Sequence, residues 1–327
     1  MGENRPNILQ PPFNVCLNGS SFLGILTIGS AQCMLDHGQI IVGNTQCYAG
    51  SSSCSLVAAV MATAPENLPS LLNSLCSLAD EVAPLSHGAL SDGFDLIQKV
   101  RSILENVLPP NAHILATGKL RVKATRLQLV DKFTPLTVHD VDQGTSSSIF
   151  SKGPKVFEIG DRCWQVLGKE EFASFSSREE MIEVLLGCIY VPWFPSWKPP
   201  SFNNKFLGDV SLMHTQNLPE DEVYSFQAGT LIKISPDPKC YARTRDKIVC
   251  GWVDTSGQRF DVSALQMFRI GDGLFPPPTS FLKTLYASGY ENATRFLMFY
   301  HAYKENDLGL KPQCTTYPYA HTVEDLM

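Results

Sequence analysis

The sequence predicts an α/β protein with a mostly parallel central sheet, because a short apolar strand runs directly into a helix twice near the N-terminus. FNVCL (13–17) is typical of a buried strand, and after a turn the stretch GILTIGSAQCMLDHG (24–38) has helical periodicity that ends at Gly38. IIVGNTQCYA (40–49) predicts a second strand region, followed by serines and an alanine-rich helix, SLVAAVMATA (55–64). Strands that each lead at once into a helix are typical of parallel neighbours in one sheet.

The rest of the chain continues this alternation within one principal domain. Pro65 and Pro69 separate the alanine-rich helix from the next one. The further expected elements are helices over 68–82, 93–109 and 177–188, strands over 119–131 and 229–235, a polar surface loop over 140–155, and a closing pair of helices over 279–306. The predicted organisation is an N-terminal lead (1–11), a main domain (12–235), an irregular insertion with closing helices packed on the same domain (236–305), and a loosely attached tail (306–327).

The composition excludes several classes of function. Hydrophobic residues make up 44% and charged residues 18% of the chain, which is typical of a globular protein. A net charge of −6 without any Lys/Arg cluster argues against nucleic-acid binding. Ten cysteines without a CxxC pair favour reduced, buried thiols over structural zinc or disulfides, and therefore an intracellular protein. The sequence contains neither a signal peptide nor a run of about 18 apolar residues, so we expect a cytoplasmic protein.

The serine cluster between the second strand and its helix resembles a nucleophile elbow, the G-x-S-x-G turn that presents a reactive serine. Gly50 supplies the first glycine, Ser52 is the central serine, and Cys54 stands in place of the last glycine. In such a turn, the N-terminus of the following helix faces the charge that develops during the reaction. The alternative is a serine-rich turn that simply caps a buried helix.

A second turn of small residues, NGSSFLG (18–24), connects the first strand to its helix. The consecutive amides of Gly19, Ser20 and Ser21 form a candidate anion-binding nest, and so a candidate oxyanion hole. An ordinary strand–helix turn is the alternative. The turn contains no Gly-Lys-Ser/Thr and no G-x-G-x-x-G, so the sequence predicts no nucleotide cofactor, and no metal site is expected. The seven histidines are scattered, and none lies in a recognisable triad context.

The two candidate catalytic turns, a later aspartate motif and long stretches between them resemble the patatin-like phospholipase domain family. Within that family, the resemblance is to the adipose triglyceride lipase subgroup. The resemblance covers roughly residues 12 to 305. It is carried by FNVCLNGSSFLGILTIGSAQC, YAGSSSCSLVAAV, FDLIQKVRSILENVLPPNAH, TGKLRVKATRL, SREEMIEVLLGCIYVPWFPSWKPPSF, KFLGDVSLMHTQNLP and LFPPPTSFLKTLYASGYENATRFLMF.

This resemblance implies a three-layer α/β/α sandwich, a Gly-rich oxyanion loop, and a Ser–Asp dyad in which the aspartate accepts the serine proton directly. It implies hydrolysis or transfer of fatty acyl groups at a lipid surface, without a cofactor. Ser52 falls at the nucleophile position, and Asp209 is the candidate base.

The chain departs from the family at each of the three catalytic motifs. Ser21 and Cys54 stand where the family has glycines. In the dyad motif a strict alignment puts Gly208 at the aspartate position, and a slip of one residue in the turn restores Asp209. The rival hypothesis is therefore a catalytically impaired homologue that binds lipid or a lipase partner without turnover.

The segment IYVPWFPSWKPP (189–200) contains the candidate lipid contacts Trp193, Phe194 and Trp197. The alternative is that these aromatic side chains pack a proline-rich loop onto the core. The expected partners are a glycerolipid or other fatty-acyl ester as substrate and a lipid droplet or membrane surface, with a protein co-regulator as a further candidate. The resemblance thus predicts a cytoplasmic protein that is peripheral on lipid droplets or membranes.

Overall fold

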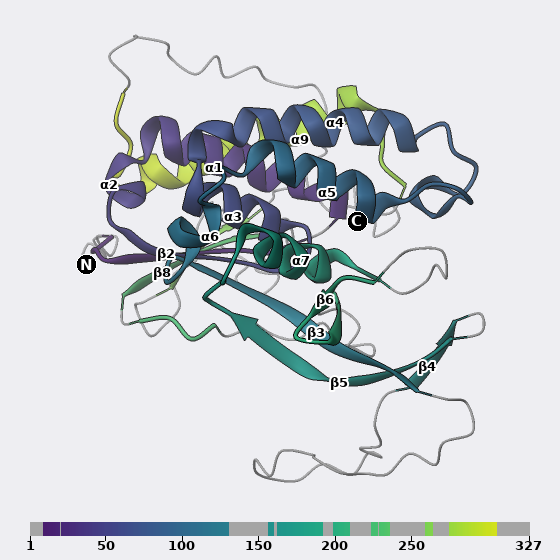
Figure 1. Ribbon diagram of the computed structural model, residues 1–327. Helices are drawn as coiled ribbons and strands as arrows, with labels where there is room; N and C mark the ends of the chain where they lie inside the picture. The colour runs from purple at the N-terminus through teal and green to yellow at the C-terminus, as the bar shows by residue number, and fades with distance from the viewer. Residues whose placement is uncertain are drawn as a thin grey trace, which may run out of the picture.

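The computed structural model describes residues 9–19, 21–130, 156–159, 162–191, 199–209, 224–227, 229–235, 259–263 and 275–305. They form a mixed α/β fold around one nine-stranded sheet (Figure 1). None of the helices in these ranges is long and apolar enough to cross a membrane. The predicted loops and tail at 140–155, 236–258 and 306–327 lie outside the described residues.

Five strands form the parallel half of the sheet. Their order is β3-β2-β1-β8-β9, and each pairs in parallel with its neighbours. The strands are β1 (Phe13–Leu17), β2 (Thr45–Gly50), β3 (Leu120–Val130), β8 (Thr230–Ser235) and β9 (Arg259–Ser263). Since β1 and β2 are neighbours that point the same way, the turns that follow them meet at one edge of the sheet.

The other half of the sheet is antiparallel and is built on the long strand β3. The strands are β4 (Val156–Ile159), β5 (Arg162–Phe172), β6 (Ser201–Phe202) and β7 (Lys205–Gly208). β3 pairs with β5 from Val122 to Val130 and with β7 from Thr125 to Leu127, so β5 and β7 lie on opposite edges of β3. β2 pairs with β3 only over Leu120–Val122. β7 therefore occupies the edge of β3 that β2 leaves free.

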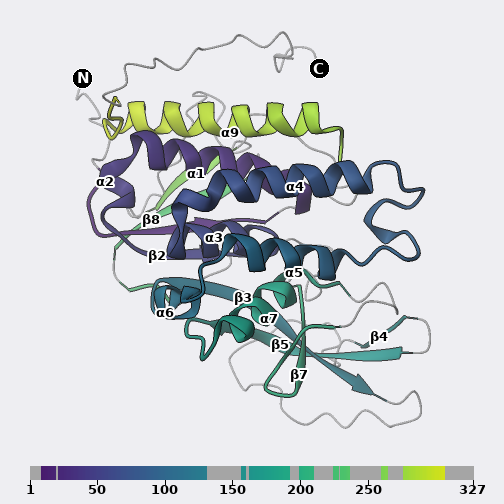
Figure 2. The same cartoon turned by 45° about the horizontal axis from the view of Figure 1, so that its top comes forward.

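The described helices that contact the sheet cover one of its faces (Figure 1). The longer helices are α1 (Ile25–His37), α3 (Cys54–Thr63), α4 (Leu68–Val82), α5 (Leu96–Val107), α7 (Arg178–Ile189) and α9 (Thr279–Phe299). Two short ones are α2 (Gln39–Val42) and α6 (Ala112–Ala116). Turned by 45°, the molecule shows α9 as the outermost helix, over α1 and α4 (Figure 2). The mostly parallel core of the predicted sheet is thus present, whereas a second helical layer is not among the described residues.

Most predicted helices and strands are confirmed, but two predictions near the ends of the chain are wrong. The first half of the stretch 40–49 forms the short helix α2, and the strand begins only at Thr45. The expected closing pair of helices is the single helix α9, which continues through Gly289. A glycine within a helix is usually unfavourable, but Gly289 lies where α9 crosses α1 most closely.

Two glycines allow this close crossing of α1 and α9. A Cβ on Gly29 would lie 2.0 Å from the backbone oxygen of Tyr286, and one on Gly289 would lie 1.9 Å from that of Leu26. Ser30 Oγ donates a hydrogen bond of 2.9 Å to the Gly289 carbonyl across the same contact. α1, the helix that follows the small-residue turn 18–24, is therefore held in place by residues some 250 positions later in the chain.

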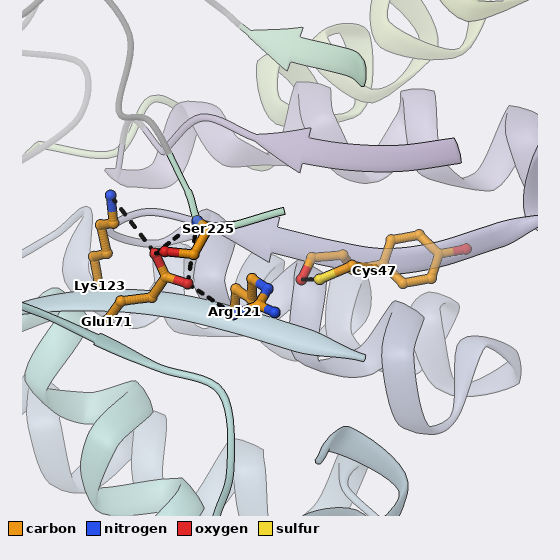
Figure 3. A network of polar contacts seen from close by, with 6 residues as sticks. Cys47, Arg121, Lys123, Glu171 and Ser225 are labelled. Atoms are coloured by element: carbon orange, nitrogen blue, oxygen red, sulfur yellow. Dashed lines mark hydrogen bonds and ion pairs between the residues drawn. The ribbon is translucent and has the colours of Figure 1, made fainter. Parts of the chain in front are cut away.

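The opposite face of the sheet carries charge, and a short segment (224–227) lies against it. Arg121 and Lys123 on β3 approach Glu171 on β5, with nitrogen–oxygen distances of 2.9 and 3.9 Å (Figure 3). The Ser225 amide donates to Glu171 Oε2 at 3.0 Å, and Lys123 Nζ lies 4.5 Å from the centre of the Tyr224 ring. The same face bears the Cys47 thiol, whose pKa burial raises to about 11 against the opposing effect of Arg121.

Candidate active site

The predicted elbow is a sharp turn between β2 and α3. Ser52 has a φ of 48°, in the left-handed region that non-glycine residues rarely adopt, as expected for a nucleophile elbow. Gly50 makes the turn sterically possible, because a Cβ there would lie 2.5 Å from the Cys54 carbonyl oxygen and 2.6 Å from the Ser55 Cα. The turn then enters α3 through hydrogen bonds from the amides of Cys54 and Ser55 to the carbonyls of Ser51 and Ser52.

The Cys54 side chain fits in place of the usual glycine because another glycine lies opposite. Cys54 is fully buried, and its sulfur lies 3.4 Å from where a Cβ on Gly24 would be. Gly24 ends the first turn, so the two turns of the site pack against each other here. Burial raises the pKa of the Cys54 thiol to about 12, although the nearby hydroxyls of Thr27 and Ser53 act in the opposite direction. Cys54 is therefore a neutral packing residue and not a nucleophile.

The Ser52 hydroxyl points directly at a carboxylate. Ser52 Oγ donates a hydrogen bond of 2.6 Å to Asp209 Oδ2, across 157 positions of sequence. At this distance no imidazole fits between the two groups. Ser52 is partly exposed, whereas Asp209 is 4% exposed, so the carboxylate is largely withdrawn from water.

The strand pairing of β7 brings Asp209 to this place. Gly208 is the last residue of β7 and pairs with Thr125, and Asp209 follows at the end of the strand. The Asp209 amide donates to the Tyr190 carbonyl at 2.7 Å, and its own carbonyl accepts from Thr125 Oγ1 at 3.0 Å. Of the two registers left open by the sequence, this geometry has Asp209, and not Gly208, in contact with Ser52.

The first turn, the candidate oxyanion loop (18–24), lies directly against the elbow. A Cβ on Gly19 would lie 2.2 Å from the Ser51 carbonyl oxygen and 2.6 Å from Ser52 Cβ, so only glycine fits. The Gly19 amide donates to Ser51 Oγ at 3.3 Å. Ser21 adopts a φ of 52°, which is strained for a residue with a side chain. Ser20 lies outside the described residues.

Two helices begin at the elbow, because α3 starts within it and Gly24, which precedes α1, packs against Ser53 and Cys54. α3 begins two residues after Ser52, and the short 3₁₀ turn Ser21–Gly24 leads into α1. The N-terminal end of a helix stabilises negative charge through its free amides and its dipole. A serine bonded to a carboxylate and facing such ends has the parts needed for acyl transfer: a nucleophile, a base and candidate donors to an oxyanion.

The structure does not test the predicted lipid contacts, and it gives a structural role to one of the histidines. The predicted lipid contacts Trp193, Phe194 and Trp197 lie outside the described residues. His37 is used structurally, because its Nδ1 lies 3.0 Å from the Lys304 carbonyl oxygen and its ring stacks on Tyr303. Within the described ranges, no group of three or more His, Cys, Asp or Glu residues is placed to hold a metal ion.

Three contributors to the site were missed in the sequence. They are Thr125 and the Tyr190 carbonyl, which hold the Asp209 backbone, and Gly24, which makes room for Cys54. Gly24 is the last residue of the small-residue turn, so the sequence did indicate a glycine at the contact between that turn and the helix. Nothing in the sequence indicated the role of Thr125, because its partner Asp209 lies 84 residues away and their contact depends on the pairing of β3 with β7.

Comparison with curated proteins identifies relatives over most of the chain, whereas no protein-family model matches it. The human patatin-like phospholipase domain-containing protein 4 is 28% identical over 287 residues, covering 87% of this chain and 96% of that protein. The rat patatin-like phospholipase domain-containing protein 2 is 23% identical over 88% of this chain. Human omega-hydroxyceramide transacylase is 24% identical over 88% of this chain. The chain spans only about half of these last two relatives, 51% and 46% of their lengths.

Comparison with solved structures gives more distant matches. VipD from Legionella pneumophila superposes with a TM-score of 0.39 at 9% identity, covering 92% of this chain and 68% of that one. The ExoU–SpcU complex of Pseudomonas aeruginosa gives a TM-score of 0.36 at 13% identity, covering 91% of this chain and 55% of that one.

Proposed function

We propose that this chain, a homologue of the patatin-like phospholipase domain-containing proteins, is a lipid acyl-ester hydrolase with Ser52 as nucleophile and Asp209 as general base. The observation that carries the proposal is the hydrogen bond of 2.6 Å from Ser52 Oγ to Asp209 Oδ2. A serine hydroxyl is a weak nucleophile unless a base accepts its proton, and Asp209 is within reach to do so.

In the acylation step, Ser52 Oγ attacks the ester carbonyl carbon while its proton passes to Asp209 Oδ2. The carbonyl oxygen becomes negatively charged in the tetrahedral intermediate. Amides of the oxyanion loop and the N-terminus of α3 lie beside Ser52 and would stabilise that charge. When the intermediate collapses, the protonated Asp209 returns the proton to the alcohol that leaves, and an acyl-Ser52 ester remains.

In the second step, an acceptor attacks the carbonyl carbon of the acyl-enzyme and Asp209 takes its proton. As the bond between the acyl carbon and Ser52 Oγ breaks, Asp209 returns that proton to Ser52 Oγ, which restores the free serine and the carboxylate. Water as acceptor gives a free fatty acid, and a lipid hydroxyl gives acyl transfer. The names of the relatives include both a phospholipase domain and a transacylase, so both acceptors belong to the proposal. The substrate class is a fatty-acyl ester such as a glycerolipid, taken from a lipid droplet or membrane surface to which the protein binds peripherally.

One observation favours the alternative of an impaired homologue that binds lipid without turnover. The Gly19 amide, a candidate oxyanion donor, already bonds to Ser51 Oγ, and Ser21 is in a strained conformation. Such a protein would bind lipid or a lipase partner and give no acyl-enzyme.

The test uses the purified full chain with three substrates: emulsified trioleoylglycerol, phosphatidylcholine vesicles, and a water-soluble p-nitrophenyl ester. Released fatty acid and transferred acyl chains are both measured, and a fluorophosphonate probe reports on the nucleophile. Ser52→Ala and Asp209→Asn are compared with Ser102→Ala, which changes an exposed serine on α5.

We expect ester turnover and probe labelling that both disappear in Ser52→Ala. Asp209→Asn should reduce turnover by roughly 10³-fold or more, because it removes the proton acceptor. Ser102→Ala should match the wild type. Turnover that persists in Ser52→Ala refutes the proposal, and lipid binding in vesicle flotation without any turnover favours the alternative.

A further inference from the structure

We infer that Thr125 is a positioning residue for the reaction: its hydroxyl fixes the Asp209 main chain and so aims the carboxylate at Ser52. The inference rests on the proposed function, because it assigns a role within the same dyad. Asp209 is the first residue beyond β7, so the main-chain hydrogen bonds between β7 and β3 no longer fix its position.

Two other hydrogen bonds hold the main chain of Asp209, one through its amide and one through its carbonyl. Its amide donates to the Tyr190 carbonyl at the C-terminal end of α7, at 2.7 Å. Its carbonyl accepts from Thr125 Oγ1 at 3.0 Å. The first bond joins two main chains, so no side-chain substitution removes it. The second depends entirely on the hydroxyl of residue 125.

The Thr125 hydroxyl is buried, so water does not substitute for it. Thr125 is 0% exposed and Asp209 is 4% exposed. Removing the hydroxyl would leave the Asp209 carbonyl buried without this donor, which favours a rotation of the peptide unit toward another donor. Because the carboxylate belongs to the same residue, such a rotation would lengthen its 2.6 Å contact with Ser52 Oγ.

This geometry also accounts for the unusual register of the aspartate. Gly208 is the residue that pairs with Thr125 in the sheet, and Asp209 lies one position further along. A side chain one position later on a regular strand would point to the opposite face. The bond from Thr125 Oγ1 holds the chain as it leaves the strand, where direction is no longer set by the pleat.

The test compares Thr125→Val with Thr125→Ser in the full chain. Valine keeps the shape of the side chain and removes the donor, whereas serine keeps the donor. Thr294→Val is the control for loss of a buried threonine hydroxyl. Thr294 on α9 donates to the Tyr290 carbonyl at 2.9 Å and contacts the Cys33 thiol at 3.2 Å, and neither partner is a residue of the dyad.

We expect Thr125→Val to lower kcat on the soluble ester by roughly 10- to 100-fold with little change in KM, since small misplacements of catalytic groups have costs of this size. Rates are normalised to the fraction of sites that the fluorophosphonate titrates, so that unfolded protein does not count. The acid limb of the kcat/KM profile should move to higher pH, because a weaker bond from Ser52 stabilises the charged carboxylate less. Thr125→Ser should restore most of the rate, and Thr294→Val should change neither kcat nor the profile.

The two proposals fail in different ways. If Ser52→Ala retains turnover, the proposed dyad is wrong. If Ser52→Ala and Asp209→Asn abolish turnover but Thr125→Val keeps the wild-type kcat and pH profile, the dyad stands and the role of Thr125 is wrong. Loss of rate in Thr125→Ser equal to that in Thr125→Val also overturns the inference, because the donor would then be irrelevant.

Discussion

The elbow at 50–54 and the candidate oxyanion loop (18–24) each connect a parallel strand to a helix, β2 to α3 in the first case and β1 to α1 in the second. Both hold a serine at positive φ, 48° at Ser52 and 52° at Ser21. In the elbow, that conformation directs the hydroxyl at Asp209, so a side chain is needed there. In the oxyanion loop the main-chain amide is the group that would act, and a glycine would offer the same amide with less strain. Under the proposed function, the positive φ is therefore required at Ser52, whereas at Ser21 a glycine could relieve it.

The largest effect should come from filling the space inside the elbow. Gly50→Ala would place a Cβ within 2.6 Å of the main chain of both Cys54 and Ser55, so α3 must shift. We expect a loss of about 3 to 5 kcal/mol in the free energy of unfolding, measured by urea titration. The control is Gly118→Ala, at a φ of 80° with nothing within 4 Å, which should cost only about 1 kcal/mol of strain. Equal effects of the two substitutions would contradict the steric role of Gly50.

The next largest effect should come from a substitution that pushes the two turns apart without adding an atom inside the elbow. Gly19→Ala would put a Cβ 2.6 Å from Ser52 Cβ, and the oxyanion loop must move away from the elbow. We expect kcat/KM on the soluble ester to fall by roughly 100-fold. The loss of unfolding free energy should be smaller than in Gly50→Ala, because the loop lies nearer the surface than the strand. Unchanged kcat/KM would show that the close approach of the turns is not needed for turnover.

A third prediction concerns the contact of Cys54 with Gly24, where the turns meet. Burial raises the pKa of the Cys54 thiol from 9.0 to about 12, so between these values the folded state retains a proton that the unfolded state loses. The free energy of unfolding should therefore fall as pH rises from about 9 to 12, by up to about 1.4 kcal/mol per pH unit from this group. Chemical unfolding at several alkaline pH values measures the slope.

The control for this prediction is Cys54→Ala, which should show a shallower alkaline slope than the wild type. The comparison uses the slope and not the stability itself, because the substitution also removes packing. The Cys33 thiol, whose pKa burial likewise raises to about 12, should supply part of the remaining slope. An identical slope in both proteins would contradict the assigned burial of the Cys54 thiol.

The smallest effect should come from removing the strain in the oxyanion loop. Ser21→Gly should raise the free energy of unfolding by about 0.5 to 1 kcal/mol, because glycine adopts positive φ readily, although it is more flexible when unfolded. Thermal unfolding measures the change. Asn203→Gly, at a φ of 46° in the turn before β7, is the control and should give a smaller gain, because asparagine adopts positive φ more readily than serine. A stability gain at 203 with a loss at 21 would show that the Ser21 side chain itself stabilises the loop.

Local patterns predicted the elements that depend on local sequence. The strand at 13–17 and the helices at 24–38 and 68–82 were expected from periodicity and from their flanking prolines and glycines, and the structure has them within a residue or two. The hairpin of β4 and β5 was missed. Its longer strand contains Gly168 at a φ of 146° and a bulge opposite Arg126, which interrupt the alternation that marks a strand.

The candidate site also contains one residue that the local sequence indicates and one that depends on the assembled fold. Ser52 was predicted because the elbow pattern lies within five consecutive residues, and the structure has the expected strand before it and the expected helix after it. Asp209 was left between two registers, because its position depends on which residue of β7 pairs with Thr125. That pairing is a property of the assembled sheet, and the residues around Asp209 do not encode it locally.

The close crossing of α1 and α9, which Gly29 and Gly289 allow, has a consequence for the order in which the chain can fold during its synthesis. The ribosome makes α1 among the first residues, but α9, which covers α1, only after more than 270 others. Until then the nascent chain exposes the apolar side of α1, next to an unfinished site. Stalled chains that end before residue 279 should therefore be captured by chaperones, whereas chains extended well beyond residue 305 should be released with α9 packed on α1.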